Sequence, residues 1–282
     1  MKLVRYGEAG RERPGLLDAG GRVRDLSGVI DDVGGRWLLP AALEMLRGID
    51  PATLPAVEGA PRLGAPVANV GKLVCIGLNY ADHADEMNLP RPDKPVVFMK
   101  ATSSICGPND DILIPPGSEK TDWEVELGIV IGAPARFVAP GDALAHVAGY
   151  TIVQDVSERD WQQNEGGQWV KAKSSDTFGP VGPWLVTADE VPDPQALDIW
   201  LEVNGTRMQD GNTATMIFGV AEVVAHISRF MTLQPGDVIA TGTPPGVGVG
   251  RTPQVFYKPG DTVRLGISGL GEQTARLVRD PR

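Results

Sequence analysis

Apolar and polar residues alternate most clearly at residues 121–132, where the sequence reads TDWEVELGIVIG. Alternate residues of an extended strand share a face, so this pattern predicts a strand with one apolar face suited to a core. The residues of that face are Val125, Leu127, Ile129 and Ile131. Glu124 and Glu126 project together from the other face, with Cα atoms about 6.5 to 7 Å apart. Because like charges this close repel, either water solvates that face or a cation lies between the two carboxylates.

Similar strand-like stretches, separated by Gly-rich or Pro-Gly turns, dominate the chain from residue 71 onward. They occupy residues 71–80, 95–101, 122–132, 147–156, 197–205, 236–242 and 261–267. One clear helix is predicted at 215–231, where apolar residues recur at helical spacing, and His226 within it is expected to be a packed or surface residue. The triplet PGD predicts tight turns wherever it occurs. Its three copies lie at 140–142, 235–237 and 259–261.

The amino-terminal part of the chain has a different pattern. It combines short strand-like pieces with one helix at 39–49, and it ends in a stretch rich in proline and alanine at 50–67 that is typical of a linker. We therefore expect a small amino-terminal α/β domain with its linker over residues 1–66, followed by a larger domain over residues 67–282.

Composition favours a mostly β fold over disorder. Of the 282 residues 42% are hydrophobic, enough for the core of one large or two ordinary domains, and 35 glycines and 24 prolines supply turns. With few long helical patterns, this predicts an α+β fold that is predominantly β. The formal net charge of −10 disfavours nucleic acid as a partner but is compatible with a local cation site.

The two cysteines, Cys75 and Cys106, are too few for a disulfide framework, so we expect reduced thiols. The opening residues MKLVRYGEAGRERPG contain no apolar leader segment. No apolar run approaches the length of about 18 residues that a membrane span requires. The sequence therefore predicts a cytoplasmic protein that has no membrane partner.

A third acidic residue stands where a predicted strand ends. Asp155 follows the strand-like residues of GYTIVQD, a usual place for functional side chains, although alone it is equally typical of a turn or a helix cap. Together with Glu124 and Glu126 it forms an all-oxygen set without a nearby cysteine or paired histidine. Such a set suits Mg²⁺ or Mn²⁺ rather than zinc, and it leaves coordination positions open for water and substrate.

Residues 78–87, LNYADHADEM, offer a candidate base. His83 and Glu86 are three residues apart, so a short helix that begins at Asn79 or Asp82 places both side chains on one face. The carboxylate can then orient the imidazole. The alternative is an exposed helical pair without a chemical role.

Two lysines adjoin strand-like sequence rich in small hydroxyl residues: Lys100 in VVFMKATSS and Lys173 in VKAKSSDTFGP. A lone lysine is usually a solvated charge. The Gly-rich segment 240–250, ATGTPPGVGVG, lacks the lysine and the long helix of a phosphate loop. We interpret it as a loop that closes over a carboxylate through residues 241–243.

The chain resembles the fumarylacetoacetate hydrolase family over nearly all of residues 70–270. The resemblance rests on six segments in order: GLNYADHADEM, VVFMKATSSICGPND, TDWEVELGIVIG, GYTIVQDVSERDWQ, KSSDTFGPVGPW and GDVIATGTPPGVG. It implies a catalytic domain of the β-roll or β-sandwich type over residues 67–282, usually assembled as a homodimer. It also places Glu124, Glu126 and Asp155 at the positions of the family's metal ligands.

The resemblance implies roles for further residues. His83 and Glu86 match the catalytic dyad on the family's lid, and Lys173 matches a catalytic position. The matches to substrate-binding positions are Lys100, Gln162, Gly242 and Thr243. The amino-terminal VRYGEAGRERPGLLD is similar to bacterial members that hydrolyse 2,4-diketo-3-deoxy sugar acids.

These roles predict hydrolysis of a carbon–carbon bond in a 2,4-dioxo acid of the acylpyruvate type, which gives pyruvate and a second acid. The expected metal polarises the 2-oxo acid, His83 oriented by Glu86 deprotonates a water molecule, and Lys173 or Gln162 stabilises the oxyanion. The family also contains decarboxylases of oxaloacetate-type acids and 2-hydroxyhepta-2,4-diene-1,7-dioate isomerases, which remain alternatives. A non-catalytic binder of oxo acids is a third alternative.

Overall fold

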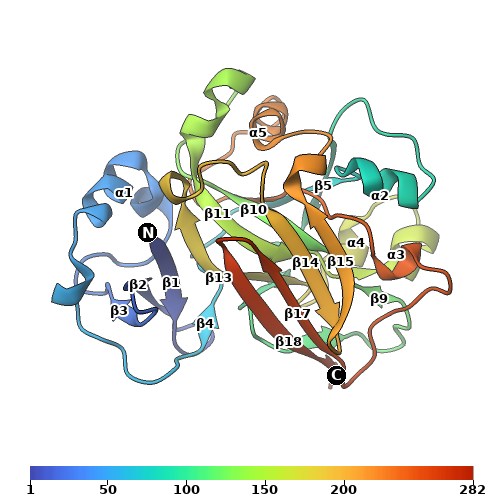
Figure 1. Cartoon of the computed structure of the whole chain (residues 1–282), viewed down its shortest axis with the longest axis horizontal. Coiled ribbons are helices and arrows are strands. Elements are labelled where there is room, and N and C mark those ends of the chain that lie inside the picture. Colours follow the sequence, from blue (N-terminus) through green and yellow to red (C-terminus); the bar gives the residue numbers. More distant parts are fainter. Residues whose placement is uncertain (282) are drawn as a thin grey trace.

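The computed structural model describes residues 1–281, and within them strands outnumber helices (Figure 1). The larger of the sheets formed by these residues has eleven strands. Its main path runs β3 (Val23–Asp25), β2 (Arg13–Leu17), β1 (Lys2–Tyr6), β13 (Gly179–Thr187), β11 (Val147–Gln154), β10 (Val125–Ile131), β16 (Val238–Ala240), β5 (Leu73–Gly77) and β6 (Val96–Lys100). Two short strands, β4 (Leu63–Gly64) and β7 (Ile105–Cys106), pair with β1 and β13.

A second sheet of five strands packs against this one. Its order is β15 (Thr206–Asn212), β14 (Asp198–Val203), β17 (Thr262–Ile267), β18 (Gly271–Arg279) and β8 (Ile112–Ile114). A short ribbon joins β9 (Thr121–Asp122) to β12 (Ser157–Glu158). The α-helices are α1 (Pro40–Arg47), α2 (Ala81–Glu86), α3 (Arg159–Asn164), α4 (Val170–Lys173) and α5 (Val220–Ser228). The architecture is thus an α+β fold that is predominantly β, as the sequence predicted.

Short 3-10 helices connect these elements. They are η1 (Gly35–Leu38), η2 (Pro51–Thr53), η3 (Thr102–Ser104), η4 (Pro140–His146), η5 (Ala188–Glu190), η6 (Thr213–Thr215) and η7 (Gly248–Gly250). None of the helices within residues 1–281 is long and apolar enough to cross a membrane.

Strand β10 has every residue buried because both faces of the sheet are covered here. The face with Leu127 and Ile129 packs in the main core together with Leu201 of β14 and Leu265 of β17. The opposite face, with Val130, packs in a second core that includes residues of α1. The alternation in the sequence therefore predicted the apolar face correctly, and the strand is a rigid support for the glutamates at its beginning.

The amino-terminal residues belong to the same sheet as the rest of the chain. Strand β1 pairs antiparallel with β13, with Leu3 opposite Leu185, and Figure 1 shows β1, β2, β3 and α1 together on one side of the molecule. The predicted helix at 39–49 is confirmed as α1. The division at residue 66 remains a prediction about folding units.

The helix predicted at 215–231 is shorter in the structure, because a long-range contact prevents its first residues from being helical. The Asn79 side chain accepts a hydrogen bond from Phe218 N at 2.9 Å and donates one to Phe218 O at 3.0 Å. The backbone of Phe218 is therefore unavailable for helical hydrogen bonds. Helix α5 begins after Gly219, whose N–H donates to Glu222 at 2.9 Å.

Other local predictions were also incomplete. The PGD triplets at 235–237 and 259–261 form turns in which the glycine has a positive φ, but the triplet at 140–142 lies in the 3-10 helix η4. That prediction was wrong because Pro140 begins a helical turn, where its missing N–H has no cost. The sequence patterns also did not identify β13, which is rich in glycine and proline, or the polar edge strand β15.

Candidate active site and metal centre

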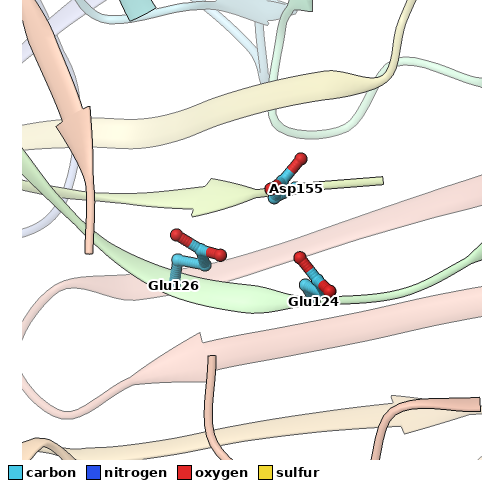
Figure 2. A group of neighbouring side chains, drawn as sticks. All are labelled: Glu124, Glu126 and Asp155. Carbon is cyan, nitrogen blue, oxygen red and sulfur yellow. The ribbon is translucent and has the colours of Figure 1, made fainter. Parts of the chain in front are cut away.

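Three carboxylates from two neighbouring strands meet at one place. Ligand atoms of Glu124, Glu126 and Asp155 all lie within 4.8 Å of one another, and Figure 2 shows the glutamates on one segment with Asp155 just beyond the adjacent strand. Antiparallel pairing sets Val125 of β10 opposite Gln154 of β11. Glu124, which precedes Val125, therefore faces Asp155, which follows Gln154. Asp155 N donates to Glu124 O at 2.9 Å. The predicted grouping of these three residues is therefore confirmed in the structure.

These carboxylates are buried rather than solvated. The exposed fractions are 7% for Glu124, 2% for Glu126 and 0% for Asp155. The interpretation of the glutamates as a water-solvated strand face is therefore wrong. Because a buried carboxylate without a compensating partner costs several kcal/mol, positive charge must lie close to this cluster.

Two cations compensate Glu124. Lys173 Nζ lies 2.6 Å from Glu124 Oε2 and 2.8 Å from Asp155 Oδ2, and Arg159 Nη2 lies 2.7 Å from Glu124 Oε1. Burial acts to raise the pKa of Glu124, but the charges of Lys173 and Arg159 outweigh it and hold the pKa well below its usual range. Glu124 is therefore ionised and available as an anionic ligand.

Glu126 is in the opposite situation. Its burial and the neighbouring charges of Asp155 and Glu124 raise its pKa well above the usual range. Gly242 N donates to its Oε2 at 2.7 Å, which offsets only part of this cost. A divalent cation held among the three carboxylates would supply the missing positive charge, and an all-oxygen set suits Mg²⁺ or Mn²⁺. The residues present therefore fit a divalent metal ion.

The predicted dyad is formed on helix α2. His83 Nδ1 lies 2.9 Å from Glu86 Oε2, and His83 is 7% exposed, so the interpretation of an exposed pair is wrong. The helix begins at Ala81, between the two predicted starting positions. Glu86 Oε1 also accepts a hydrogen bond from Gly246 N at 2.9 Å, which fixes the carboxylate that orients the imidazole. With Nδ1–H directed at Glu86, the free lone pair of His83 is on Nε2.

The loop after β16 holds a carboxylate, as predicted, but that carboxylate belongs to the protein. Gly242 N contacts Glu126, and the Thr243 hydroxyl donates to Val125 O at 2.8 Å. Gly242 has φ +96°, and a Cβ there would lie 2.8 Å from the Cβ of Asn79. Only glycine fits this backbone without strain.

The two predicted lysines have different positions. Lys173, at the end of α4, lines the cavity and is held by two carboxylates. Burial acts to lower the pKa of Lys173, but Asp155 and Glu124 outweigh burial and raise it. Lys173 therefore stays charged and acts as a cation rather than a base.

Lys100 was expected at a substrate-binding position, but the structure places it away from the cavity lining. Its side chain is fully buried, with Nζ 2.5 Å from Asp155 Oδ1 and 3.0 Å from Val156 O. Within residues 1–281 it is not part of the cavity lining. Lys100 thus neutralises Asp155 in the interior, through the carboxylate oxygen that Lys173 does not contact.

The sequence patterns did not identify two buried charged residues of the site, Arg159 and Asp122. Arg159 lines the cavity and joins Asp122 to Glu124: its Nε lies 2.8 Å from Asp122 Oδ2. Asp122 also accepts hydrogen bonds from Gly248 N at 2.7 Å and Val249 N at 3.0 Å. A charged residue in SERDW is typical of the protein surface. The only sequence signal for Arg159 is therefore its position four residues after Asp155.

A cavity of about 360 Å³ brings the predicted residues together. Its lining includes Glu124, Glu126, His83, Lys173, Gln162, Gly242 and Thr243. Gln162 Oε1 accepts a hydrogen bond from Arg159 Nη1 at 2.9 Å. One cavity thus contains an imidazole oriented by a carboxylate, a charged lysine and two carboxylates of a cluster suited to a metal ion.

The fold and this site define a class: α+β proteins with an acidic centre for a divalent metal ion beside a histidine–glutamate dyad. The family described as Fumarylacetoacetate (FAA) hydrolase C-terminal matches residues 72–278. The chain belongs to the fumarylacetoacetate hydrolase family, and it is an enzyme of that family.

Individual relatives agree with this assignment. A protein of Burkholderia cenocepacia (strain HI2424), named "Putative hydrolase", is 65% identical over 277 residues that cover 98% of both chains. The structure of fumarylacetoacetate hydrolase from Exiguobacterium antarcticum aligns with a TM-score of 0.85 at 37% identity, covering 99% of this chain and 100% of that one. Maleylpyruvate hydrolase from Sphingobium sp. SYK-6, in complex with manganese(II) ion and pyruvate, aligns with a TM-score of 0.82 at 31% identity, covering 99% of each chain.

Proposed function

We propose that the protein is a divalent-metal-dependent hydrolase that cleaves the carbon–carbon bond of a 2,4-dioxo acid of the acylpyruvate type. One water molecule adds across the bond between C3 and C4. The acyl carbon C4 leaves as a carboxylic acid, and C3 gains a proton to become the methyl group of pyruvate. Mg²⁺ or Mn²⁺ is the proposed cofactor, and a cytoplasmic homodimer is the proposed form of the enzyme.

One observation carries this proposal: His83, held by Glu86, lines the same cavity as Glu124 and Glu126 of the acidic cluster. Attack of water on a carbonyl needs a base, whereas decarboxylation does not. His83 Nε2 removes a proton from the attacking water, and Glu86 holds the ring and stabilises the imidazolium that forms. The imidazolium then releases its proton to solvent, and C3 of the leaving pyruvate enolate takes a proton from a water molecule.

The polar residues around the cluster orient the substrate and offset its charge. A divalent cation held by Glu124, Glu126 and Asp155 would stabilise the negative charge that develops on the 2-oxo acid when the bond breaks. Lys173 keeps its charge beside the cluster, and Gln162 offers an amide to a substrate oxygen. The maleylpyruvate hydrolase named above is a complex with manganese(II) ion and pyruvate, which supports a divalent metal ion and a 2-oxo acid as ligands of the proposed site.

The test is an incubation of the purified protein with Mg²⁺ or Mn²⁺ and a panel of 2,4-dioxo acids, oxaloacetate and a 2-hydroxydienedioate, with products identified by mass. The proposal predicts pyruvate and a second acid from a 2,4-dioxo acid, and loss of this activity in EDTA. Carbon dioxide from oxaloacetate as the only product would favour the decarboxylase. An isomerised dienedioate as the only product would favour the isomerase, and unchanged substrates would favour a non-catalytic binder.

A further inference from the structure

The cavity is lined by two chemically different sets of residues. The carboxylates of the cluster and Lys173 form a polar and charged set. A second set of lining residues is apolar, comes from separate parts of the chain and is called the apolar wall. They are Met87, Leu89, Phe98, Trp169, Val247 and Val249. A substrate that binds its 2-oxo acid at the cluster must place the rest of its carbon skeleton against this apolar wall.

Trp169 is seated firmly in this wall. Its indole meets the ring of Phe98 edge-on, with centroids 5.3 Å apart and planes at 70°. It also lies on the bare backbone of Gly77, where an added Cβ would be 2.6 Å from the indole Cζ3. Because glycine has no side chain there, the indole comes close to the sheet and forms a flat surface beside the cavity.

The wall begins directly beside the charged set. Lys173 Nζ lies 5.2 Å from the centroid of the Phe98 ring. Trp169 directly precedes α4 and Lys173 is its last residue. Because the two are four residues apart, their side chains lie near the same side of this helical turn. A group attached to C4 of a bound 2,4-dioxo acid therefore reaches aromatic surface within a few bonds.

The cations of the cavity are already paired. Arg159 is bound to Asp122 and Glu124, and Lys173 to Glu124 and Asp155. Apart from His83, these are the only cationic side chains that line the cavity within the described part of the chain. A second carboxylate on the substrate would gain no free cationic partner at the apolar wall, so any hydration that it lost there would be uncompensated. Among the six wall residues, a polyhydroxylated chain would find no side-chain hydrogen-bond partner apart from the indole N–H of Trp169.

We propose that the acyl group of the substrate is apolar: an aliphatic chain or a phenyl ring that carries no second carboxylate, packed on Trp169, Phe98, Met87 and Leu89. This inference rests on the proposed function and narrows its substrate class. It differs from the sugar acids that the amino-terminal resemblance implies, and the apolar wall is the reason for the difference.

A binding experiment tests the inference without turnover. Two 2-oxo acids share a head group but differ at the far end: 2-oxo-4-phenylbutanoate carries a phenyl ring, and 2-oxoglutarate carries a carboxylate. Neither has a carbonyl at C4, so the proposed hydrolysis cannot occur. In calorimetric titrations with Mg²⁺ present, we expect the phenyl compound to bind at least about tenfold more tightly, the scale for burial of one ring.

The possible results separate this inference from the proposed function. Equal or tighter binding of 2-oxoglutarate would overturn the apolar acyl group and leave the 2-oxo acid site intact. If neither compound and no pyruvate bound, the proposed function itself would fail. Cleavage of 2,4-dioxo-4-phenylbutanoate with a kcat/KM at least about tenfold above that of 2,4-dioxohexanedioate would confirm the preference in turnover. The reverse order would contradict it.

Variants locate the group on the wall. Trp169→Ala should weaken the binding of 2-oxo-4-phenylbutanoate by about tenfold. It should leave the affinity for pyruvate unchanged, because pyruvate has no distal group. Trp37→Ala is the matched control, since Trp37 is also half-buried but lies in η1, outside the cavity lining. If both variants changed the affinity for 2-oxo-4-phenylbutanoate equally, Trp169 would not form the binding surface.

A second pair of variants adds charge instead of removing a ring. Leu89→Arg places a cation at the wall and should raise the affinity for 2-oxoglutarate, relative to that for the phenyl compound, by about tenfold. Leu144→Arg is the control, because Leu144 is similarly exposed (49% against 43%) and lies in η4. An unchanged ratio in Leu89→Arg would show that the distal group does not lie against this wall.

Discussion

At the scale of single residues, the site is defined by an unequal distribution of charge. Glu124 has two cations within 2.7 Å, and Lys100 and Lys173 share Asp155. Glu126 receives a backbone hydrogen bond and faces two other carboxylates. Without a metal ion, the protein therefore contains one carboxylate whose burial is poorly compensated, and a divalent ion bound here would add most stability.

This inequality predicts opposite effects of two similar substitutions. Without metal, Glu126→Gln should leave stability unchanged or raise it, because it removes a repelling buried charge while keeping the side chain's shape. Glu124→Gln should lower the free energy of unfolding by about 3 kcal/mol, the order observed when one partner of a buried ion pair is removed. Denaturant unfolding in EDTA measures both.

The same two variants should behave alike toward metal. Each removes one ligand charge, so each should lose the rise in melting temperature that Mg²⁺ or Mn²⁺ gives the wild type. Glu44→Gln on the exposed side of α1 is the control, and it should keep the full rise. A wild-type metal response in Glu126→Gln would show that Glu126 is not a ligand.

At the scale of elements, two carboxylates fasten the loop after β16 to the rest of the site. Glu86 of α2 accepts from Gly246 N, and Asp122 accepts from Gly248 N and Val249 N. Helix α2 has six residues, too few to be stable without such contacts. The position of His83 over the cavity therefore depends on Glu86 twice, through the imidazole contact and through the docking of the helix.

We expect Glu86→Ala to loosen α2 as well as misorient His83. Amide hydrogen exchange over residues 81–86 should become faster, and kcat for the 2,4-dioxo acid should fall by about tenfold or more with the overall fold intact. Glu86→Gln keeps a hydrogen-bond acceptor for Gly246 and should restore most of the slow exchange. Unchanged exchange in Glu86→Ala would mean that other contacts hold the helix.

The elements also mark what sequence patterns can predict. The strands with regular alternation, including the one that carries Glu124 and Glu126, and helix α1 follow from local periodicity, which is why they were predicted. Helix α5 is shorter than its pattern because Asn79, far away in sequence, binds the backbone of Phe218. The apolar wall could not be predicted, because its residues come from separate segments that only the fold brings together.

At the scale of the whole molecule, the amino-terminal residues are part of the continuous sheet. Leu3 is fully buried and packs in the same core as Leu185 and Val130. Met1 O accepts a hydrogen bond from Thr187 N at 3.0 Å, which extends the contact between β1 and β13. We infer that the amino-terminal part and the catalytic part stabilise each other although the sequence divides them at a linker.

Accordingly, Leu3→Ala should lower the stability of the entire chain by about 2 to 5 kcal/mol, the cost of a large-to-small change in a core. Calorimetry should record one transition in the variant, as in the wild type. Val29→Ala, at a position 37% exposed, should change stability little. A separate early transition, with the catalytic part unaffected, would establish two independent folding units.

The central claim is that His83 activates water while the acidic cluster holds the 2-oxo acid, so the two halves of the site should be separable. The direct measurement compares wild type and His83→Ala, with Mg²⁺, in two assays: release of pyruvate from a 2,4-dioxo acid, and deuterium exchange at the methyl group of pyruvate followed by NMR. We predict that His83→Ala loses hydrolysis by about 100-fold or more, the scale for a lost general base, and retains methyl exchange. Hydrolysis by His83→Ala at the wild-type rate would contradict the account.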